Sequence, residues 1–132
     1  MKSKRNQKAF TLVELVMVIV IIGLLAAVVI PQFGDMRTEA QGAAENATAS
    51  AVISGIKLAR MTNLTKGTDA YPATLDSAAN GNASDLNPLF TNVIDNGVTD
   101  KNWKKVNATT YQFVPTTRNY KYDKTTGKFT KQ

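Results

Sequence analysis

The residue types that usually carry catalysis and metal binding are scarce in this chain. Its 132 residues include no cysteine and no histidine. Thiolate zinc sites, cysteine nucleophiles and Ser-His-Asp triads are therefore excluded. No pair of carboxylates has a spacing that indicates general acid–base chemistry. We predict that the chain is not an enzyme.

One carboxylate occupies an unusual position. Glu14 is the only acidic residue of the stretch KAFTLVELVMVIVIIGLLAAVVIPQF, residues 8–33, and no charged or strongly polar residue follows it at positions 15–30. Residues 12–30 are long enough to span a bilayer, because about 20 helical residues cover roughly 30 Å. A charged group in hydrocarbon is costly and usually has a partner and a function. Glu14 is therefore the first candidate functional residue.

Three interpretations of this segment compete. A cleavable secretory signal has a shorter apolar region that ends in an A-x-A-like pattern, which is missing here. A plain membrane anchor explains the length but not the carboxylate. If the chain is cut between Ala9 and Phe10, the new α-amine lies about one helical turn from Glu14 and can pair with it in the same chain or in a neighbour. At about 4 Å and an effective dielectric near 20, such a pair attracts by roughly 4 kcal/mol before desolvation is subtracted.

The net charge of +6 is concentrated near the amino terminus. Lys2, Lys4, Arg5 and Lys8 precede the apolar run with no acidic residue among them, and without residues 1–9 the balance is +2. Such a flank is typical of the cytoplasmic side of a membrane helix. We therefore do not expect nucleic acid as a partner.

The stretch of residues 8–33 resembles the class III signal and first helix of type IV pilins and of the pseudopilins of type II secretion. The resemblance rests on a short basic leader, a small residue, the sequence FTLVE at positions 10–14 and a long apolar helix with Pro31. It implies that a prepilin peptidase cuts after Ala9, where the family usually has glycine, and methylates the amine of Phe10. It also implies that Glu14 guides the docking of subunits.

Gly23 and Pro31 are two poor helix-forming residues within the apolar stretch. Proline removes one hydrogen bond and bends a helix, and glycine lowers helix propensity. Both are tolerated irregularities in membrane helices. The resemblance implies in addition that the segment between them loosens in assembled filaments and provides flexibility.

Beyond Pro31, small and apolar residues recur at helical spacing. This pattern predicts that the helix continues to about residue 64 and ends near Lys66-Gly67, with polar residues such as Glu45 mostly outside the apolar stripe. Because alanine allows close approach, we expect a flat partner within the chain to cover the stripe. The stripe consists of Phe33, Met36, Ala40, Ala44, Ala47, Ala51 and Leu58, broadened by Ala43, Val52 and Ile56.

The flat partner is expected at the carboxyl end. Residues 109–132 contain short β-prone runs separated by turn residues, which predict an antiparallel sheet of three or four strands. Tyr111 and Phe113 share one face, as do Tyr120 and Tyr122, and we expect these aromatics to pack on the helix. Trp103 is expected to anchor the preceding loop against the sheet.

The region between helix and sheet, residues 65–108, is rich in Asn, Gly, Asp and Thr and is predicted to be mostly surface loop. The resemblance implies that this loop is variable between members of the family. Within it, SDLNPLFTNVI indicates a short helix capped by Ser84 or Asp85, with Leu86, Leu89, Phe90 and Val93 facing inward. Asp95, Asn96 and Asp100 form an oxygen-rich cluster that does not match a calcium loop. A solvated turn is the preferred interpretation. No cofactor is expected, with calcium as the minor alternative.

The predicted fold is α+β, with a long amino-terminal helix, half membrane-spanning and half amphipathic, packed on a small antiparallel sheet. Residues 1–9 are predicted to be a cytoplasmic leader that is removed, 10–30 a transmembrane and filament-core helix, and 31–132 a globular head. Within the head, the helix is expected to reach about residue 64, the loop to cover 65–108 and the sheet 109–132.

The preferred function is a structural subunit of a type IV pilus-like filament for adhesion, motility or DNA uptake. It would enter the bacterial inner membrane, polymerise with identical copies through an assembly machinery and reach the cell surface. The alternative is a pseudopilin in a periplasmic pseudopilus for protein export. The resemblance implies a carboxyl-terminal cysteine pair in the commonest adhesive pilins, so the lack of cysteine favours the pseudopilin. It also implies a calcium loop near the carboxyl end of major pseudopilins, so the lack of an acidic cluster there favours the pilin. A membrane-anchored protein that never polymerises is the third hypothesis.

Overall fold

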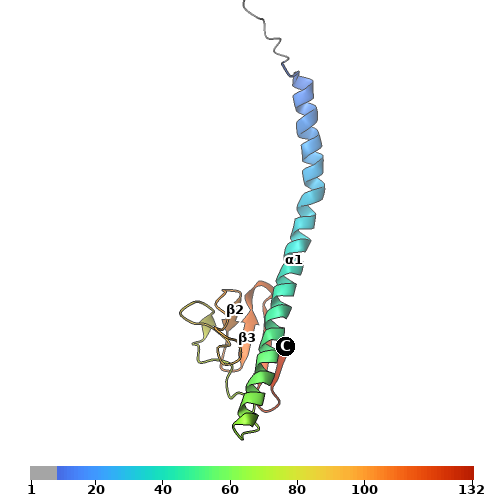
Figure 1. Cartoon of the computed structure of the whole chain (residues 1–132). Helices are drawn as coiled ribbons and strands as arrows, with labels where there is room; N and C mark the ends of the chain where they lie inside the picture. Colours follow the sequence, from blue (N-terminus) through green and yellow to red (C-terminus); the bar gives the residue numbers. More distant parts are fainter. Residues whose placement is uncertain (1–8) are drawn as a thin grey trace, which may run out of the picture. The chain divides into compact units, whose positions relative to one another are not determined.

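A computed structural model describes residues 9–132 of the chain. In this part the fold is α+β, with the long helix α1 (Leu12–Thr65) followed by a small antiparallel sheet (Figure 1). The strands are β1 (Gly81–Asn82), β2 (Trp103–Lys105), β3 (Thr110–Phe113), β4 (Arg118–Asp123) and β5 (Lys128–Lys131), with the short 3-10 helix η1 (Val114–Thr116) after β3. The chain divides into two compact units, one ending at Glu39 and the other spanning Ala40–Gln132, which are described separately.

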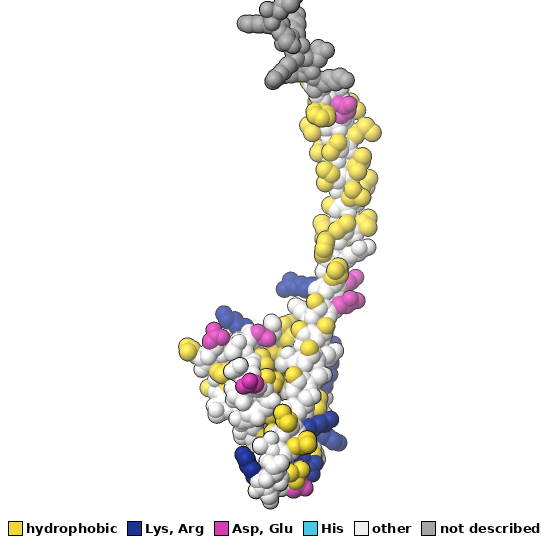
Figure 2. All heavy atoms as spheres, in the orientation of Figure 1, with side chains coloured by type: hydrophobic (Ala, Val, Ile, Leu, Met, Phe, Trp, Pro, Cys, Tyr) yellow, Lys and Arg dark blue, Asp and Glu magenta, His cyan; other side chains and the backbone are white. Residues whose placement is uncertain are grey.

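The amino-terminal half of α1 exposes apolar side chains on all sides, and Figure 2 shows one apolar face of this segment. A helix that is hydrophobic all round belongs in a membrane or in the interior of an assembly. Within residues 9–132, α1 is the one helix long and apolar enough to cross a bilayer. Pro31 lies inside the helix. Its missing N–H removes one backbone hydrogen bond there.

The helix ends at Thr65, as the sequence predicts. The amide of Thr68 donates to the carbonyl of Asn63 at 2.9 Å, and the amide of Gly67 donates to that of Leu64 at 2.9 Å. These two bonds form a Schellman motif, which requires a left-handed residue at the turn. Gly67 supplies it with a φ of 83°.

The sheet of the head has the strand order β1-β2-β3-β4-β5, with every neighbouring pair antiparallel. Tyr111 lies opposite Tyr120, and Tyr122 lies opposite Phe129. Alternate residues of each strand face the helix and form a core with its carboxyl-terminal half. The core contains Ala49, Val52, Ile56, Leu75, Ala83, Leu89, Phe90, Trp103, Tyr111, Phe113, Tyr120, Tyr122 and Phe129. The predicted packing of the aromatic face on the helix is therefore confirmed.

The sheet is larger than predicted. Five strands are present in residues 9–132 rather than three or four, because β1 and β2 come from the region predicted to be loop. Trp103 is itself part of β2 and is fully buried. Strands of two or three residues have too little pattern of their own to be recognised, and they exist here because a longer strand pairs with them.

The short helix predicted within residues 84–94 is wrong. Ser84 and Asn87 instead pair across a tight turn, and Leu89 pairs with Val98. Leu89 and Phe90 do face the core, but Leu86 is 98% exposed. The backbone of Phe90 has a positive φ of 63°, which is incompatible with a continuing helix.

The covered face of α1 also differs from the prediction. The sheet buries Glu45, Ala49, Val52 and Ile56, of which only Val52 and Ile56 belong to the predicted stripe. Each residue turns a helix by about 100°, so the remaining alanines point away from the sheet. We call this uncovered, uncharged row the alanine strip. It consists of Ala40, Ala43, Ala44, Ala47, Ala51 and Leu58, all exposed.

Glycine and a polar network explain this choice of face. A side chain at Gly55 would come within 1.9 Å of the carbonyl oxygen of Val93, so glycine allows the loop to lie directly on the helix. On the same side, Glu45 has hydrogen-bond partners on the sheet. The physical reason for the correction is that close approach and a buried charge network outweigh the small apolar gain of burying alanine.

Candidate functional site

The start of α1 is held by a reciprocal pair of hydrogen bonds. The amide of Thr11 donates to Oε2 of Glu14 at 2.9 Å, and the amide of Glu14 donates to Oγ1 of Thr11 at 3.2 Å. Together they form a capping box, in which two otherwise unpaired amides of the first turn are satisfied. The T-x-x-E spacing at positions 11–14 is the sequence signal from which this motif could have been predicted.

The capping box gives Glu14 a role in the single chain. A carboxylate in the first helical turn lies near the positive end of the helix macrodipole, which stabilises its charge. Among the described residues, Glu14 makes no ion pair. A partly stabilised carboxylate at the start of an apolar helix still offers acceptor capacity to a donor from outside the chain.

The residues of the predicted cleavage site directly precede this motif. Phe10 is 89% exposed, and Ala9 is exposed as well. A recess of about 770 Å³ beside the carboxylate is lined by Phe10, Glu14 and neighbouring apolar residues. The rest of the predicted leader, 1–8, lies outside the described residues, so cleavage after Ala9 and methylation of Phe10 stay predictions.

Gly23 lies in the middle of the apolar half of α1, and a side chain there would meet no atom within 4 Å. Both Gly23 and Pro31 fall within the continuous helix. The loosening of the segment between them therefore stays a prediction about the assembled state.

The head contains a buried charge that sequence reasoning placed outside the covered face. Glu45 is fully buried and accepts a 2.6 Å hydrogen bond from the hydroxyl of Tyr120 and a 2.9 Å bond from Thr116. Arg118 and Lys131 lie 3.4 and 3.6 Å from its carboxylate oxygens. Burial by itself raises the pKa of Glu45, but these hydrogen bonds and charges outweigh it and leave the pKa below its ordinary value.

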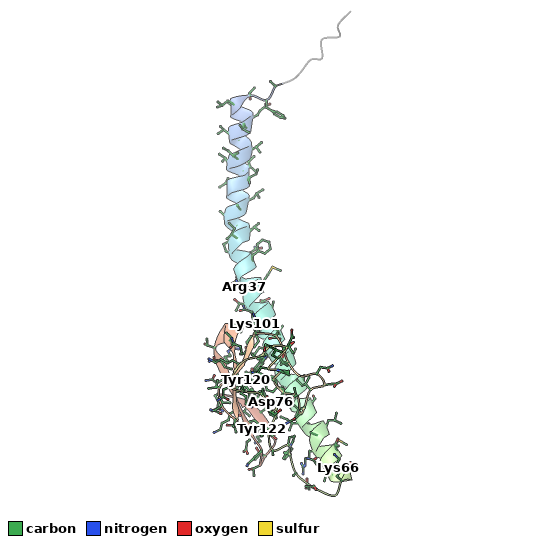
Figure 3. All side chains as sticks on the ribbon, turned by 90° about the vertical axis from the view of Figure 1, so that its left-hand side faces the viewer. Arg37, Lys66, Asp76, Lys101, Tyr120 and Tyr122 are labelled. Atoms are coloured by element: carbon green, nitrogen blue, oxygen red, sulfur yellow. The ribbon has the colours of Figure 1, made fainter. Side chains whose placement is uncertain are left out.

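A second buried carboxylate organises the loops before β3. Asp76 accepts hydrogen bonds from the hydroxyl of Tyr111 at 3.0 Å and from the amide of Phe90 at 2.9 Å. It also forms an ion pair with the nearly buried Lys105, whose ammonium donates to the carbonyl of Ala78. Burial, followed by the nearby Asp76, raises the pKa of Tyr111. Figure 3 places Asp76 and Tyr120 among the side chains of the head.

These two carboxylates have structural roles. Each is saturated by donors and closed to solvent, so neither has room for a substrate. They connect segments far apart in sequence, and a buried charge held in this way is costly to break. The sequence signal that could have revealed them is weak, because Glu45 and Asp76 stand in unremarkable polar stretches.

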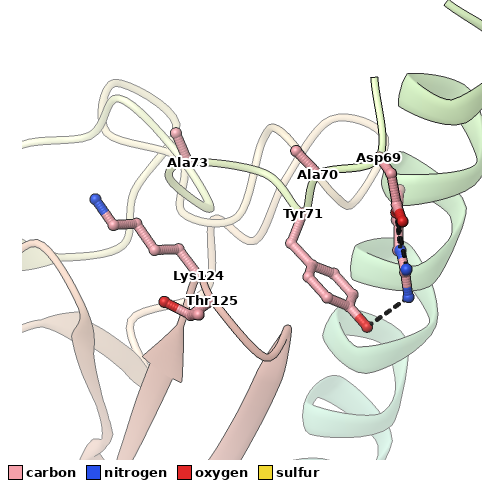
Figure 4. A pocket seen from close by; sticks show the side chains of 7 residues that line it. Asp69, Ala70, Tyr71, Ala73, Lys124 and Thr125 are labelled. Carbon is pink, nitrogen blue, oxygen red and sulfur yellow. Dashed lines mark hydrogen bonds and ion pairs between the residues drawn. The ribbon is translucent and has the colours of Figure 1, made fainter. Parts of the chain in front are cut away.

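The head also has an open pocket of about 530 Å³ between α1, the following loop and the β4–β5 turn (Figure 4). Arg60 forms an ion pair with Asp69 at 2.8 Å and donates to the hydroxyl of Tyr71 at 2.9 Å. The charge of Arg60 is thus neutralised by its own neighbour. The pocket has no nucleophile next to a base, which is what covalent catalysis requires.

No group of three or more His, Cys, Asp or Glu residues that could hold a metal ion is found in residues 9–132. Asp100 of the oxygen-rich cluster accepts a hydrogen bond from the amide of Asn102 at 2.9 Å. This is a local turn of the kind that Asp commonly forms.

The geometry defines a protein with an exposed apolar helix, a capped carboxylate at its start and a small α+β head. The family model described as the prokaryotic N-terminal methylation motif matches residues 4–30. The chain is 50% identical over 52 residues to the type IV narrow pilus major component PilA5 of Thermus thermophilus. This match covers 39% of this chain and 45% of the relative. It is 43% identical to the type IV major fimbrial protein FimA of Dichelobacter nodosus, over 54% of this chain and 44% of the relative.

The chain is also 32% identical to the type II secretion system core protein G of Pseudomonas aeruginosa, over 54% of this chain and 46% of the relative. The matches thus span slightly less than half the length of these curated relatives. No solved structure matches the chain. The methylation motif and these relatives support the resemblance of residues 8–33 to type IV pilins and pseudopilins.

Proposed function

We propose that this chain is a structural subunit of a type IV pilus-like filament and polymerises through the apolar half of α1. The observation that carries the proposal is the exposure of apolar side chains on every side of this segment, with one carboxylate at its start. In a monomer, lipid would cover this surface. In a filament, identical helices would cover it, and the alanine strip would allow them to approach closely along the second half of α1.

Glu14 would guide docking in this assembly. After cleavage, the α-amine of Phe10 in an incoming subunit would pair with the carboxylate of a neighbour, within the recess beside Glu14. Such a pair forms in a low-dielectric surrounding, where attraction is strong and an unpaired charge is costly. Prepilin peptidase and an inner-membrane assembly machinery would be the partners of the chain before the filament forms.

The second candidate is a pseudopilin of a periplasmic secretion pseudopilus. The similarity to the type II secretion system core protein G favours it, whereas the similarities to the pilus component and the fimbrial protein favour the surface filament. Asp123 in the β4–β5 turn accepts hydrogen bonds from Thr125 and Thr126. The carboxylate of Asp123 is thus occupied by its own turn, and the β4–β5 hairpin offers no acidic cluster of the kind expected of a pseudopilin. We therefore retain the surface filament as the first candidate. Electron microscopy of sheared surface material separates the two, because a pseudopilus stays within the envelope.

The maturation step can be tested by mass spectrometry of the amino terminus. We expect a mature chain that begins at methylated Phe10. A membrane-associated chain that begins at Met1 in cells with an active prepilin peptidase contradicts the proposal.

The docking role of Glu14 can be separated from its capping role. Glutamine also completes a capping box, so Glu14→Gln should retain the helix start and the cleavage but reduce filament yield sharply by removing the charge. Thr11→Ala is the matched control, because it removes the cap, at a cost of about 1 kcal/mol, and keeps the carboxylate. Filament yield lost in Thr11→Ala and retained in Glu14→Gln would show that Glu14 acts as a cap alone.

A further inference from the structure

The head presents one large apolar side chain almost entirely to solvent. Leu86 is 98% exposed and lies next to exposed Asp85 at the tip of a turn. The turn is closed by backbone bonds in both directions between Ser84 and Asn87, at 3.0 and 3.3 Å. We call Asp85 and Leu86 the knob.

The knob is held rigidly by the side chain of Asn87. Its Oδ1 accepts a hydrogen bond from the backbone amide of Ala79 at 2.9 Å, and its Nδ2 donates to the carbonyls of Ala79 and Asn82 at 3.1 and 3.4 Å. A mobile loop could fold a leucine back onto the head, but this turn is fixed by its own bonds. A preorganised apolar side chain loses little conformational entropy on binding.

A complementary hollow lies on the same head. Its volume is about 650 Å³, and Lys121, Lys124 and Lys128 line it together with the small apolar residues Ala73 and Ala108. Asp123 also lines the hollow, but its carboxylate accepts hydrogen bonds from Thr125 and Thr126, and the three lysines leave the lining with a net positive charge. The lysines are exposed, and no ion pair of theirs is found within residues 9–132. We call this hollow the socket. It offers positive charge to a carboxylate and a shallow apolar floor to an aliphatic side chain.

The knob and the socket lie at opposite edges of the sheet. The knob directly follows β1, whereas the socket is built largely from β4 and β5, and the strand order is β1-β2-β3-β4-β5. Neighbouring strands are about 4.8 Å apart, so the two edges are separated by roughly 19 Å. The knob of one head therefore cannot enter its own socket.

The charges of the two regions are opposite. Residues 69–100, which contain the knob, have no basic residue, and three of their acidic residues are exposed without an ion pair in residues 9–132: Asp85, Asp95 and Asp100. Residues 101–132 have one acidic residue, Asp123, and five exposed lysines without such an ion pair: Lys101, Lys104, Lys121, Lys124 and Lys128. Opposite potentials on two surfaces favour their encounter and fix their register.

We propose that the knob of one head docks into the socket of a second copy of this chain. Asp85 then faces the socket lysines, and Leu86 packs on Ala73 and Ala108. The contact joins two different surfaces, and a heterologous contact of this kind generates an open helical array when its rotation does not close a ring. The inference rests on the proposed function, because filament assembly brings the heads together.

A disulfide can report the contact, since the chain has no native cysteine. Leu86→Cys and Ala108→Cys are introduced together in the full chain, and intact filaments are treated with a mild oxidant. We expect a ladder of covalent multimers on a non-reducing gel and at most dimers from either single variant. The matched control combines Leu86→Cys with Asn119→Cys, an exposed position on β4 that does not line the socket. An equal ladder from the control overturns the assignment of the socket.

Charge reversal provides the second test. Asp85→Lys reverses the knob, and Lys121→Glu with Lys128→Glu reverses the socket. Each variant alone places like charges in contact, and we expect filament yield to fall at least tenfold. A one-to-one mixture alternates the two variants so that every contact is again between opposite charges, and it should recover most of the yield. Recovery also shows that both variants fold.

The outcomes separate this inference from the proposed function. The knob-and-socket contact is overturned if the wild-type chain forms filaments but the Leu86→Cys and Ala108→Cys variant gives no ladder. It is also overturned if the mixed charge variants give no more filaments than each variant alone. Both outcomes leave the filament role intact. Absence of filaments from the wild-type chain, together with an uncut amino terminus, overturns both.

Discussion

The hydroxyl of Tyr120 donates a 2.6 Å hydrogen bond to the buried carboxylate of Glu45 and thereby joins strand β4 to helix α1. The two residues are 75 positions apart in sequence. Arg118 and Lys131 lie near the same carboxylate, with their own side chains about half exposed. The sheet is thus held to the helix by a directional contact in addition to its aromatic core.

Removal of this hydrogen bond should destabilise the head. Tyr120→Phe leaves one carboxylate oxygen of Glu45 without its hydroxyl donor, and we expect the free energy of unfolding to fall by about 1–3 kcal/mol. Tyr71→Phe is the control, because the hydroxyl of Tyr71 is bonded to the partly exposed Arg60, and its loss should cost less. Chemical denaturation of the detergent-solubilised chain, followed by near-UV circular dichroism, measures both. Equal losses would contradict the special role of Glu45.

The stability of the head should depend on pH at both extremes. The pKa of Glu45 is lowered in the folded state, so its contribution is complete above its ordinary value near 4.5 and is lost as the pH falls through the folded value. Burial, followed by Glu45, raises the pKa of Tyr120 to about 12 from an ordinary value of 10.0, so that contribution is lost as the pH rises from 10 towards 12. Melting temperatures of the wild type and of Glu45→Gln, measured from pH 2 to 12, test this. The variant should show a flatter acid limb.

Two glycines of the same helix should respond in opposite ways to alanine. A side chain at Gly55 would collide with the backbone of Val93, whereas one at Gly42 would meet no atom within 4 Å. Gly42→Ala should stabilise the helix by about 1 kcal/mol through helix propensity. Gly55→Ala should destabilise the head, because the loop must move away from α1. Thermal unfolding of the two variants in parallel would refute the close approach if both gained stability.

A charge on the alanine strip should impair assembly without affecting the fold. Ala47 is exposed on the strip, and Ala47→Glu should change the stability of the head by less than about 0.5 kcal/mol. If the strip packs against other copies, the buried and unpaired carboxylate should reduce filament yield strongly. Asn46→Glu is the matched control, since Asn46 is also exposed but lies about 100° around the helix. Similar yields from the two variants would show that the strip stays in solvent.

Much of the organisation of this chain could be predicted from local patterns. The apolar run after Glu14 and the glycine at position 67 are signals read within a few residues, and the helix covers Leu12–Thr65 as they indicate. The alternation of Tyr111, Phe113, Tyr120 and Tyr122 likewise predicted the buried face of the sheet. The capping box at Thr11 and Glu14 was equally local and could have been predicted.

Local patterns were therefore enough to predict the length and end of the helix, its apolar first half, and the alternating strands near the carboxyl end. The tertiary fold settled which face of α1 is covered, because small residues occur both on the alanine strip and on the covered face at Ala49, and Gly55 and Glu45 select a face through partners far along the chain. It also decided that β1 and β2 exist and that Leu86 points to solvent. These features depend on hydrogen bonds and packing between distant segments, which leave no periodic signal in either segment alone.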